Sequence, residues 1–441
     1  MTAPENASTP AEHRLTRVLG LREAVALGVG GTIGGGIFVL VGAAAGEAGP
    51  GALLSFGLAF LASLLIALPY AELACRFPLA GGGYAVAHAV LGRRWGFLMG
   101  WGYWGAYLAV SGYVTLGFGG YLDNLIGLPT AVGAVALVTS CTAVNLAGVR
   151  LSARVQALVV LLAAAALLGF GLLGLPHVEL DRFTPAFPQG PSGVLTGALL
   201  AFLAFGGFDM VAAAGEEIAE PDRNLPLAIL LTLVAVLGLY LLVAIVALGV
   251  LPWNQLGASS APLSDAASEF AGGTGRTGVA VAALLTTAAT ANAVLVVTSR
   301  IAFAMARDGL LPSAVARVDP RTGATRVAIL LSGALLAAVA LAGSIDLAAT
   351  TGGFLYVLHF IVPLAALILL RRRDPSRPAF RTPLPALVLP IALAASLALL
   401  LASGRTGILL GCAWLAVGLA AHAAITRRSR HPNTIDRSHN D

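Results

Sequence analysis

Long apolar segments recur along the whole chain, and they constrain its fold more than any other feature. Each is close to the ~20 residues that an α-helix needs to cross a bilayer, and they follow one another from Ala24 to Ile425. Hydrophobic residues make up 58% of the 441 residues and charged residues only 11%, whereas a soluble domain carries about 25% charged residues. No water-soluble fold buries that much apolar surface, so the sequence predicts an all-α integral membrane protein.

Charged residues, prolines and glycines divide this apolar sequence into segments that we expect to be transmembrane helices. There are twelve of them, which places both termini on the same side of the membrane. They cover residues 24–46, 51–73, 96–121, 131–148, 154–175, 194–215, 226–250, 277–301, 325–343, 349–370, 385–402 and 406–425. The chain then divides into a polar tail over 1–20, a transmembrane domain over 21–425 and a second polar tail over 426–441.

The placement of the arginines predicts the orientation. All 26 basic residues are arginine, and with a cytoplasmic N-terminus only Arg182, Arg276 and Arg405 face the outside. Such a bias follows the positive-inside rule, so we expect a multi-pass protein of the cytoplasmic (cell) membrane with both tails inside. The net charge of +5 reflects this topology and not nucleic-acid binding. The run from Arg371 to Arg373 is expected to set topology and contact lipid headgroups.

Two of the predicted spans are interrupted by glycine. The first contains Gly34, Gly35 and Gly36 in a row, and the sixth contains Gly206 and Gly207 shortly before an acidic residue, Asp209. Each glycine inside a helix costs about 0.5–1 kcal/mol relative to alanine. Close helix packing is the alternative explanation for the first run. Glycine breaks at corresponding places in two halves indicate a transporter with a midplane binding site.

A helix broken at mid-membrane depth exposes backbone groups that lipid cannot satisfy, so the break must line a cavity. The second half-helix presents N–H donors and a positive dipole end, which suit a carboxylate. The first half-helix presents carbonyls, which suit an ammonium group. Together they predict an α-amino acid as the substrate, with an amine or polyamine as the alternative.

Four motifs carry a resemblance to a known family. They are Gly31 to Phe38; Tyr70 to Pro78 with Ala80 to Tyr84; Glu216 and Glu217 with Glu220 to Pro226; and Ala304 to Pro312. Together they resemble the amino acid-polyamine-organocation (APC) permeases, and among these most of all the bacterial relatives of cationic amino acid transporters. The resemblance implies the leucine-transporter fold, with inverted five-helix repeats over about 21–175 and 194–370 and two peripheral helices over about 385–425. It also implies secondary active transport, as permease or exchanger, by alternating access.

The resemblance further implies which backbone groups hold the substrate. The carboxylate would meet the amides of Gly34, Gly35 and Gly36. The amino group would meet backbone carbonyls from both breaks. Those carbonyls belong to Thr32 and Ile33 in the first break and to Leu203, Ala204 and Gly206 in the second.

Aromatic and acidic side chains near the breaks complete the expected site. Phe205 is the main candidate for a gate or pocket wall, and Phe208, Tyr107, Tyr113 and Tyr356 are further candidates, against ordinary aromatic packing. Asp209 is a candidate for coupling or gating because an acidic residue inside a membrane is usually functional, with a structural hydrogen-bonded acid as the alternative. Glu72, Glu216 and Glu217 are expected to form ion pairs near cytoplasmic helix ends.

The coupling ion is left open by the sequence. Proton-coupled relatives carry a lysine in the fifth span and some a glutamate in the third, where this chain has Ala163 and Ala106. Thr298 and Ser299 match a sodium site of other relatives. The alternative to a sodium site is that both hydroxyls bond the preceding turn of their own helix. No other metal is expected. Sodium symport, uniport, exchange and proton coupling by another route all remain possible modes of transport.

Other function classes fit less well. A channel needs a continuous polar pore, whereas the intramembrane polar residues cluster near the two breaks; a non-transporting membrane sensor is a further alternative. No HExxH, Walker or Rossmann motif occurs, so we expect neither an enzyme, nor an ATP-driven pump, nor a cofactor. The expected partners are a small amino acid or amine and the lipid bilayer. The exact substrate, the direction of transport and homo-oligomerisation are not encoded in any recognisable pattern.

Overall fold

The computed structural model describes residues 19–76, 90, 92–148, 153–213, 218–319, 321, 324–373 and 380–430. Within these ranges every regular element is a helix, and Leu19 and Ile218 form an isolated β-bridge. Most of both polar tails, the stretch from Phe77 to Tyr84, and the pair Glu216 and Glu217 lie outside the described residues.

The chain folds into a series of long helices joined by short connections. The α-helices are α1 (Leu21–Thr32), α2 (Gly35–Ala48), α3 (Ala52–Arg76), α5 (Arg93–Ile126), α6 (Thr130–Leu146), α7 (Ala153–Gly174), α8 (Gly190–Ala204), α9 (Asp209–Ala213), α10 (Pro221–Val250), α11 (Trp253–Ala258), α12 (Pro262–Arg307), α13 (Arg326–Ala342), α14 (Ile345–Arg373), α15 (Pro385–Ala402) and α16 (Gly404–Arg430). Short 3₁₀ turns follow α2, α7 and α12.

The helix lengths and composition agree with a membrane protein. Eight segments of the described chain are long and apolar enough to span a bilayer, and α6 and α13 are shorter apolar helices. In the described chain each of the twelve predicted intervals contains one helix or, in the first and sixth, two helices separated by a break, while the number of membrane crossings stays a prediction. The longest element, α12, is two helices that meet at Gly272, where φ is +58°; the predicted span 277–301 lies in its second part.

Local sequence explains where several helices begin and end. α10 starts at Pro221, whose missing N–H costs no hydrogen bond at the first helical position. α5 and α13 are followed by Gly127 and Gly343, which adopt the left-handed conformation that closes a helix. Each stop therefore coincides with a residue that can leave the helix at little cost.

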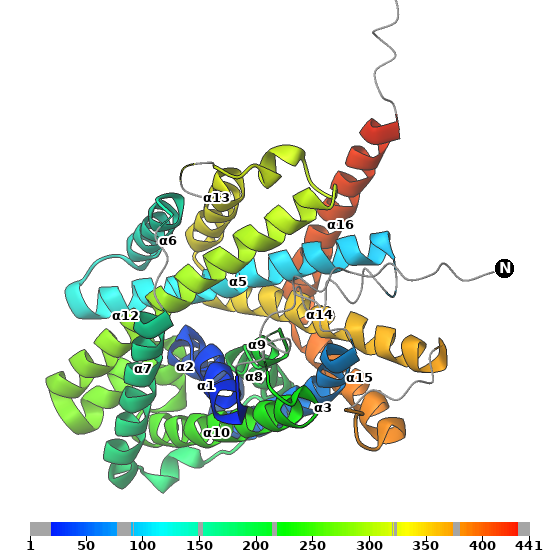
Figure 1. Ribbon diagram of the computed structural model, residues 1–441. Helices are drawn as coiled ribbons and strands as arrows, with labels where there is room; N and C mark the ends of the chain where they lie inside the picture. The colour runs from blue at the N-terminus through cyan, green and yellow to red at the C-terminus, as the bar shows by residue number, and fades with distance from the viewer. Residues whose placement is uncertain are drawn as a thin grey trace, which may run out of the picture.

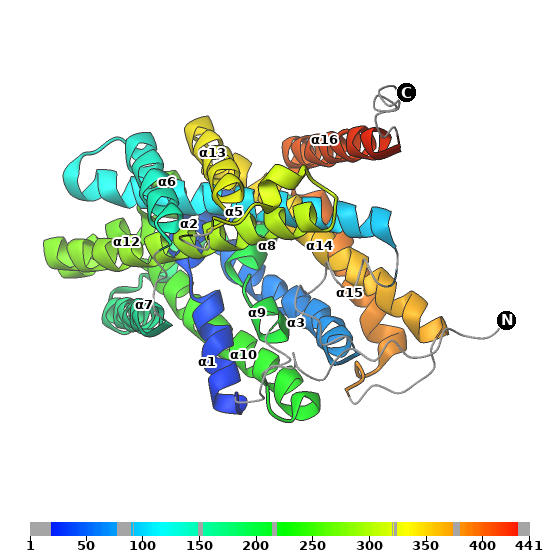
Figure 2. The same ribbon diagram turned by 45° about the horizontal axis from the view of Figure 1, so that its top comes forward.

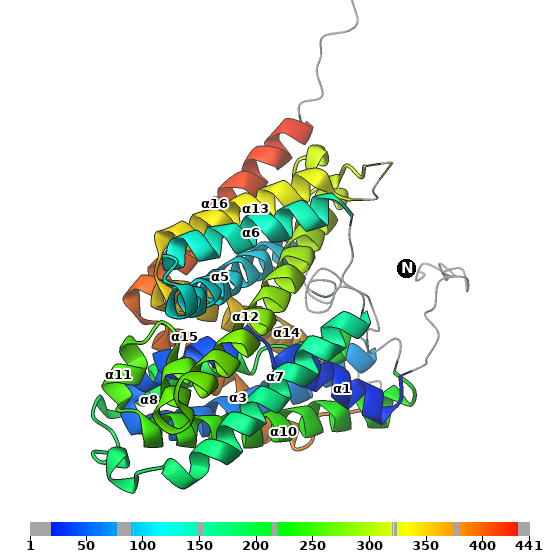
Figure 3. The same ribbon diagram turned by 90° about the vertical axis from the view of Figure 1, so that its left-hand side faces the viewer.

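The helices form two groups around a crossing layer. In Figure 3, α5, α6, α13 and α16 lie on one side, α1, α3, α8 and α10 on the other, and α12 and α14 pass between them. Figures 1 and 2 agree, and show α16 at the edge of the molecule. α2 and α3 pack on α8, α1 packs on α10, and both α12 and α14 pack on α5. This arrangement places the α1–α2 and α8–α9 connections in the interior.

Candidate functional site

The first span is broken as predicted. α1 ends at Thr32 and α2 begins at Gly35, so Ile33 and Gly34 are non-helical. Ile33 has φ −74° and ψ 77°, and the Gly34 N–H donates to the Thr32 carbonyl at 2.8 Å. The glycine run therefore ends one helix and starts another within two residues, and it does not serve helix packing alone.

The second predicted break is present in the sixth span. α8 ends at Ala204 and α9 begins at Asp209, with a turn over 205–208. Gly207 has φ +116°, a conformation that side chains rarely adopt. A Cβ on Gly207 would overlap the Gly31 carbonyl oxygen and lie 2.9 Å from the Thr32 nitrogen. Gly207 is thus required both by its backbone conformation and by the close approach of the first break.

The two breaks lie directly against each other. A Cβ on Gly36 would lie 3.4 Å from the Ala204 Cα, so the start of α2 faces the end of α8. The Tyr240 hydroxyl of α10 lies 2.9 Å from the Thr32 carbonyl oxygen and 3.2 Å from that of Ala204. Its single hydrogen is shared between one carbonyl of each break, so Tyr240 holds the breaks together.

The three amides predicted to bind a carboxylate differ in their hydrogen bonds. Gly34 N–H is used by the Thr32 carbonyl, and Gly35 N–H donates to Thr290 Oγ1 of α12 at 3.0 Å. Among the described residues, Gly36 N–H has no hydrogen-bond partner. The start of α2 thus offers one unused donor, and a second that a ligand would have to take from Thr290.

The carbonyls of the first break also differ. A carbonyl oxygen has two lone pairs, and the Thr32 oxygen accepts from both Gly34 N–H and the Tyr240 hydroxyl. Within the described chain, the Ile33 oxygen accepts no hydrogen bond. Of the two carbonyls predicted here for the ammonium group, Ile33 is the one with full acceptor capacity.

The second break repeats this pattern. The Leu203 oxygen accepts Gly206 N–H at 3.0 Å and the Ala204 oxygen accepts the Tyr240 hydroxyl. The Gly206 oxygen accepts no hydrogen bond from any residue that the structure describes. The break therefore presents one unused carbonyl and two that each retain a lone pair.

A tyrosine network surrounds Asp209, directly after the second break. Asp209 is 3% exposed; its Oδ2 accepts the Tyr103 hydroxyl and its Oδ1 the Tyr356 hydroxyl, both at 3.3 Å. The Tyr103 and Tyr107 hydroxyls lie 3.1 Å apart. The carboxylate thus joins α9 to α5 and α14 inside the helical core.

Comparison with known proteins assigns the family. The sequence model described as amino acid permease matches residues 19–414, which include both breaks. The chain belongs to the amino acid permease family. Branched-chain amino acid permease BcaP of Bacillus subtilis (strain 168) is 32% identical to this permease over 96% of each chain.

Other relatives of the permease carry different names. Methylthioribose transporter of Bacillus subtilis (strain 168) is 32% identical over 94% of each chain. Human cationic amino acid transporter 4 is 35% identical over 75% of this chain and 56% of that protein. The relatives are thus transporters of small molecules, and the APC membership predicted from the motifs is confirmed.

The aromatic candidates of the permease are packed around the breaks. Phe205 is fully buried, with its ring centroid 5.4 Å from Tyr240 and 6.5 Å from Phe60. The Tyr113 hydroxyl would lie 3.7 Å from a Cβ on Gly36, so it faces the start of α2. Phe205 therefore lies within the second break, and Tyr113 of α5 faces the first.

The α12 hydroxyls predicted for sodium bond to their own helix. Thr298 Oγ1 donates to the Val294 carbonyl at 2.9 Å, and Ser299 Oγ donates to the Val296 carbonyl at 2.9 Å. The α12 residue that bonds the first break is Thr290, eight residues earlier, which is about 12 Å along a helix. The structure thus brings Thr290 to the start of α2, and the sodium site at Thr298 and Ser299 stays a prediction.

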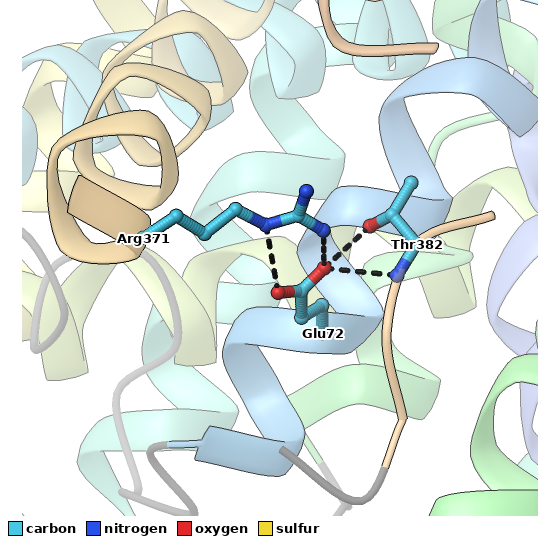
Figure 4. Close-up of polar contacts among 3 residues, drawn as sticks. All are labelled: Glu72, Arg371 and Thr382. Carbon is cyan, nitrogen blue, oxygen red and sulfur yellow. Dashed lines mark hydrogen bonds and ion pairs between the residues drawn. The ribbon is translucent and has the colours of Figure 1, made fainter. Parts of the chain in front are cut away.

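An ion pair joins the ends of α3 and α14. Glu72, fully buried, accepts hydrogen bonds from Arg371 Nε at 3.0 Å and from Arg371 Nη2, and from the N–H and Oγ1 of Thr382 at 2.9 and 2.7 Å. Figure 4 shows the three side chains converging from α3, α14 and the segment before α15. The predicted ion pairing of Glu72 is confirmed. The expected headgroup contact is wrong for Arg371, because its guanidinium turns inward to a buried carboxylate.

Sequence reasoning missed Tyr240 and Thr290, which contact the breaks. Tyr240 is the only aromatic residue of α10, and a single aromatic residue in a helix rich in aliphatic residues is a usable signal. Thr290 is one of several threonines on α12, so only the packing of α12 on α2 distinguishes it.

Proposed function

We propose that this permease is a secondary active transporter of amino acids, working by alternating access in the cell membrane with both termini in the cytoplasm. The observation that carries the proposal is the direct contact between the two helix breaks. One break ends in amide donors and the other in carbonyl acceptors, and both lie inside the helical core.

The geometry suits the two charged groups of one α-amino acid. Gly36 N–H, at the positive end of the α2 dipole, favours a carboxylate. The Ile33 and Gly206 carbonyls retain their acceptor capacity for an ammonium group. A Cβ on Gly36 would lie 3.4 Å from the Ala204 Cα, so the two breaks are in direct contact, which supports a single ligand that meets both.

We include in the proposal the remaining predicted backbone ligands. Gly34 and Gly35 would reinforce the carboxylate site, and Thr32, Leu203 and Ala204 would shape the ammonium site through their bonds to neighbouring groups. Phe205 would form the wall next to the ammonium group. The proposal also retains twelve crossings with inverted repeats over 21–175 and 194–370 and peripheral helices over 385–425, since the broken helices are the first and sixth of the series.

Reconstitution into proteoliposomes tests this function. Vesicles loaded with an unlabelled amino acid should accumulate the same labelled amino acid by counterflow, and a panel of side chains identifies the preferred substrate. Decarboxylated analogues should compete weakly, because they lack the group that meets α2. Equal competition by these amines would replace the amino acid by an amine or polyamine as substrate, and absence of counterflow with every amino acid would refute the proposal.

A matched pair of variants locates the site. Gly36→Leu places a side chain between Ala204 and the Tyr113 hydroxyl and should abolish counterflow. Gly57→Leu, at a position of α3 where the described structure leaves the space around a Cβ open to 4 Å, should leave it intact. Full counterflow with Gly36→Leu would show that the substrate binds elsewhere.

A further inference from the structure

His359 is a buried polar side chain that the proposed substrate site does not use. It lies in the middle of α14 and is 2% exposed. Within the described part of the chain, neither its Nδ1 nor its Nε2 has a hydrogen-bond partner. Leaving buried polar nitrogens unpaired costs free energy, whereas a phenylalanine would fill the same space without that cost. In this conformation the imidazole therefore stabilises the fold less than an apolar ring would.

Aromatic rings enclose His359 in a particular geometry. The Tyr103 ring lies parallel to the imidazole, with centroids 3.9 Å apart and planes at 15°. The Tyr356 ring is also nearly parallel, at 6.5 Å and 16°. The negative face of an aromatic ring attracts a cation held over it within about 6 Å of its centroid. Tyr103 meets this distance and Tyr356 lies just beyond it, so the stacked face of Tyr103 would favour an imidazolium.

The same two tyrosines connect His359 to Asp209, the one carboxylate that the described residues contribute to the cluster. The Tyr103 ring stacks on His359 and the Tyr356 ring lies nearly parallel to it at 6.5 Å, while both tyrosines direct their hydroxyls to Asp209. Asp209 is 3% exposed and follows directly on the second break. Each of the two tyrosines therefore contacts both His359 and the carboxylate that would supply the counter-charge of an imidazolium.

We propose that His359 and Asp209 form the proton-binding site that couples this permease to a proton gradient, with the proton carried on the imidazole ring. This rests on the proposed amino acid transport. In the step, a proton from water on the open side forms a bond to an imidazole nitrogen, giving an imidazolium paired with the Asp209 carboxylate. The same N–H bond breaks when the opposite side opens, so one proton crosses per cycle and the site returns to its starting charge.

Other titratable groups near His359 fit this assignment. They are Tyr70 of α3, Tyr103 and Tyr107 of α5, Asp209 of α9 and Tyr356 of α14. Tyrosine hydroxyls in water ionise only near pH 10, so they do not exchange protons at neutral pH. Arg371 lies twelve residues farther along α14, about 18 Å, and is paired with Glu72. The positions of the lysine and glutamate of related proton relays hold Ala163 and Ala106, both buried.

The position of Asp209 links the proton to the substrate. The Tyr356 hydroxyl that bonds Asp209 would also lie 3.2 Å from a Cβ on Gly206, whose carbonyl is an acceptor of the proposed ammonium site. Any change in the second break on substrate binding therefore moves an atom that also contacts the carboxylate partner of His359. Substrate and proton would thus act on a shared set of contacts, as coupling requires.

Proteoliposomes with the membrane potential clamped at zero test the proposal through two readouts. The first is accumulation of labelled amino acid driven by a lower external pH, and the second is counterflow at equal pH. A difference of one pH unit supports up to about tenfold accumulation per coupled proton. Wild type should show this accumulation, and His359→Gln and His359→Phe should lose it while keeping counterflow. His177→Gln, which changes an exposed histidine after α7, should retain both.

Each result decides the matter. Counterflow without any pH-driven accumulation in wild type would overturn the proton site while leaving the proposed function standing. Accumulation that persists in His359→Gln and His359→Phe would overturn it as well. Loss of counterflow together with accumulation in both variants would assign His359 to folding or substrate binding and refute the proposal. Absence of counterflow in wild type would instead refute amino acid transport itself.

Discussion

Replacing Arg371 by methionine should destabilise the permease strongly, because Glu72 would lose the guanidinium that neutralises it. Methionine replaces the apolar stem of arginine and removes its guanidinium, so packing along the stem changes little. The Glu72 carboxylate is fully buried and would retain its two hydrogen bonds from Thr382. The variant thus isolates the charge and the two guanidinium hydrogen bonds.

The magnitude follows from those two bonds. Hydrogen bonds to charged groups contribute about 1.5–3 kcal/mol each, and breaking a buried ion pair by removing one partner costs about 3–5 kcal/mol. The two figures agree. Globular proteins unfold with an entropy of about 2 cal/mol/K per residue, so for 441 residues the cost corresponds to a fall of about 3–5 °C in the midpoint of thermal unfolding.

The reverse change should cost less. Glu72→Gln leaves the charge on Arg371, whose side chain is 12% exposed at the end of α14 and can turn toward water or headgroups. We expect a loss of about 1–3 kcal/mol. The double variant Glu72→Gln with Arg371→Met removes both charges and should lose less than the sum of the single variants, with a coupling of about 0.5–3 kcal/mol.

Thermal unfolding in detergent, followed by tryptophan fluorescence, measures these differences. Arg372→Met is the matched control, since Arg372 is exposed in the next position of the same helix and should change the midpoint by less than 1 °C, about the effect of a neutral surface change. Equal midpoints for the Arg371 and Arg372 variants would refute the reasoning, and so would strict additivity in the double variant.

Three further predictions test the site at the breaks by counterflow. Tyr240→Phe removes the hydroxyl shared by the breaks and should weaken substrate binding about tenfold, the equivalent of ~1.4 kcal/mol for one buried hydrogen bond; unchanged affinity would contradict its role. Gly35→Ala places a Cβ 2.7 Å from Thr287 Cγ2 and should lower exchange, whereas the control Gly57→Ala should leave exchange unchanged. Adding Thr287→Ser to Gly35→Ala removes the overlapping methyl group and should restore part of the exchange activity. Thr298→Val should leave exchange unchanged in sodium and in sodium-free buffer, because the hydroxyl bonds its own helix; loss of a sodium stimulation would establish the sodium site instead.

The helical fold and both breaks could be predicted from sequence because their causes are local. A run of about 20 apolar residues can cross a bilayer as a helix without placing a polar side chain in lipid. Gly34 to Gly36 lower the stability of a helix whatever packs against it. The same holds for Gly206 and Gly207. These effects need no knowledge of what packs against the segment, so composition and spacing were sufficient to place the breaks within a residue or two.

The partners of the breaks could not be predicted because they depend on helix register. Thr290 bonds Gly35 across 255 positions of sequence, and a shift of α12 by one turn would bring Thr286 or Val294 there instead. Thr298 and Ser299 were identified by matching positions between families, which does not say which turn of α12 meets the start of α2; the structure shows that it is the turn of Thr290. Register of this kind is decided by side-chain packing over the whole interface.

Neighbouring arginines illustrate the same limit and show how α3 and α14 are linked. Arg371 and Arg372 are identical in sequence terms, yet one pairs with Glu72 and the other is exposed, because successive helical positions point about 100° apart.

Tyr70 and Glu72, two residues apart on α3, contact residues twelve apart on α14, namely His359 and Arg371. Pro363 lies between those two and removes a backbone hydrogen bond from α14. A change in the tilt of α3 against α14 therefore alters the surroundings of His359 and of the ion pair together, unless α14 bends at Pro363.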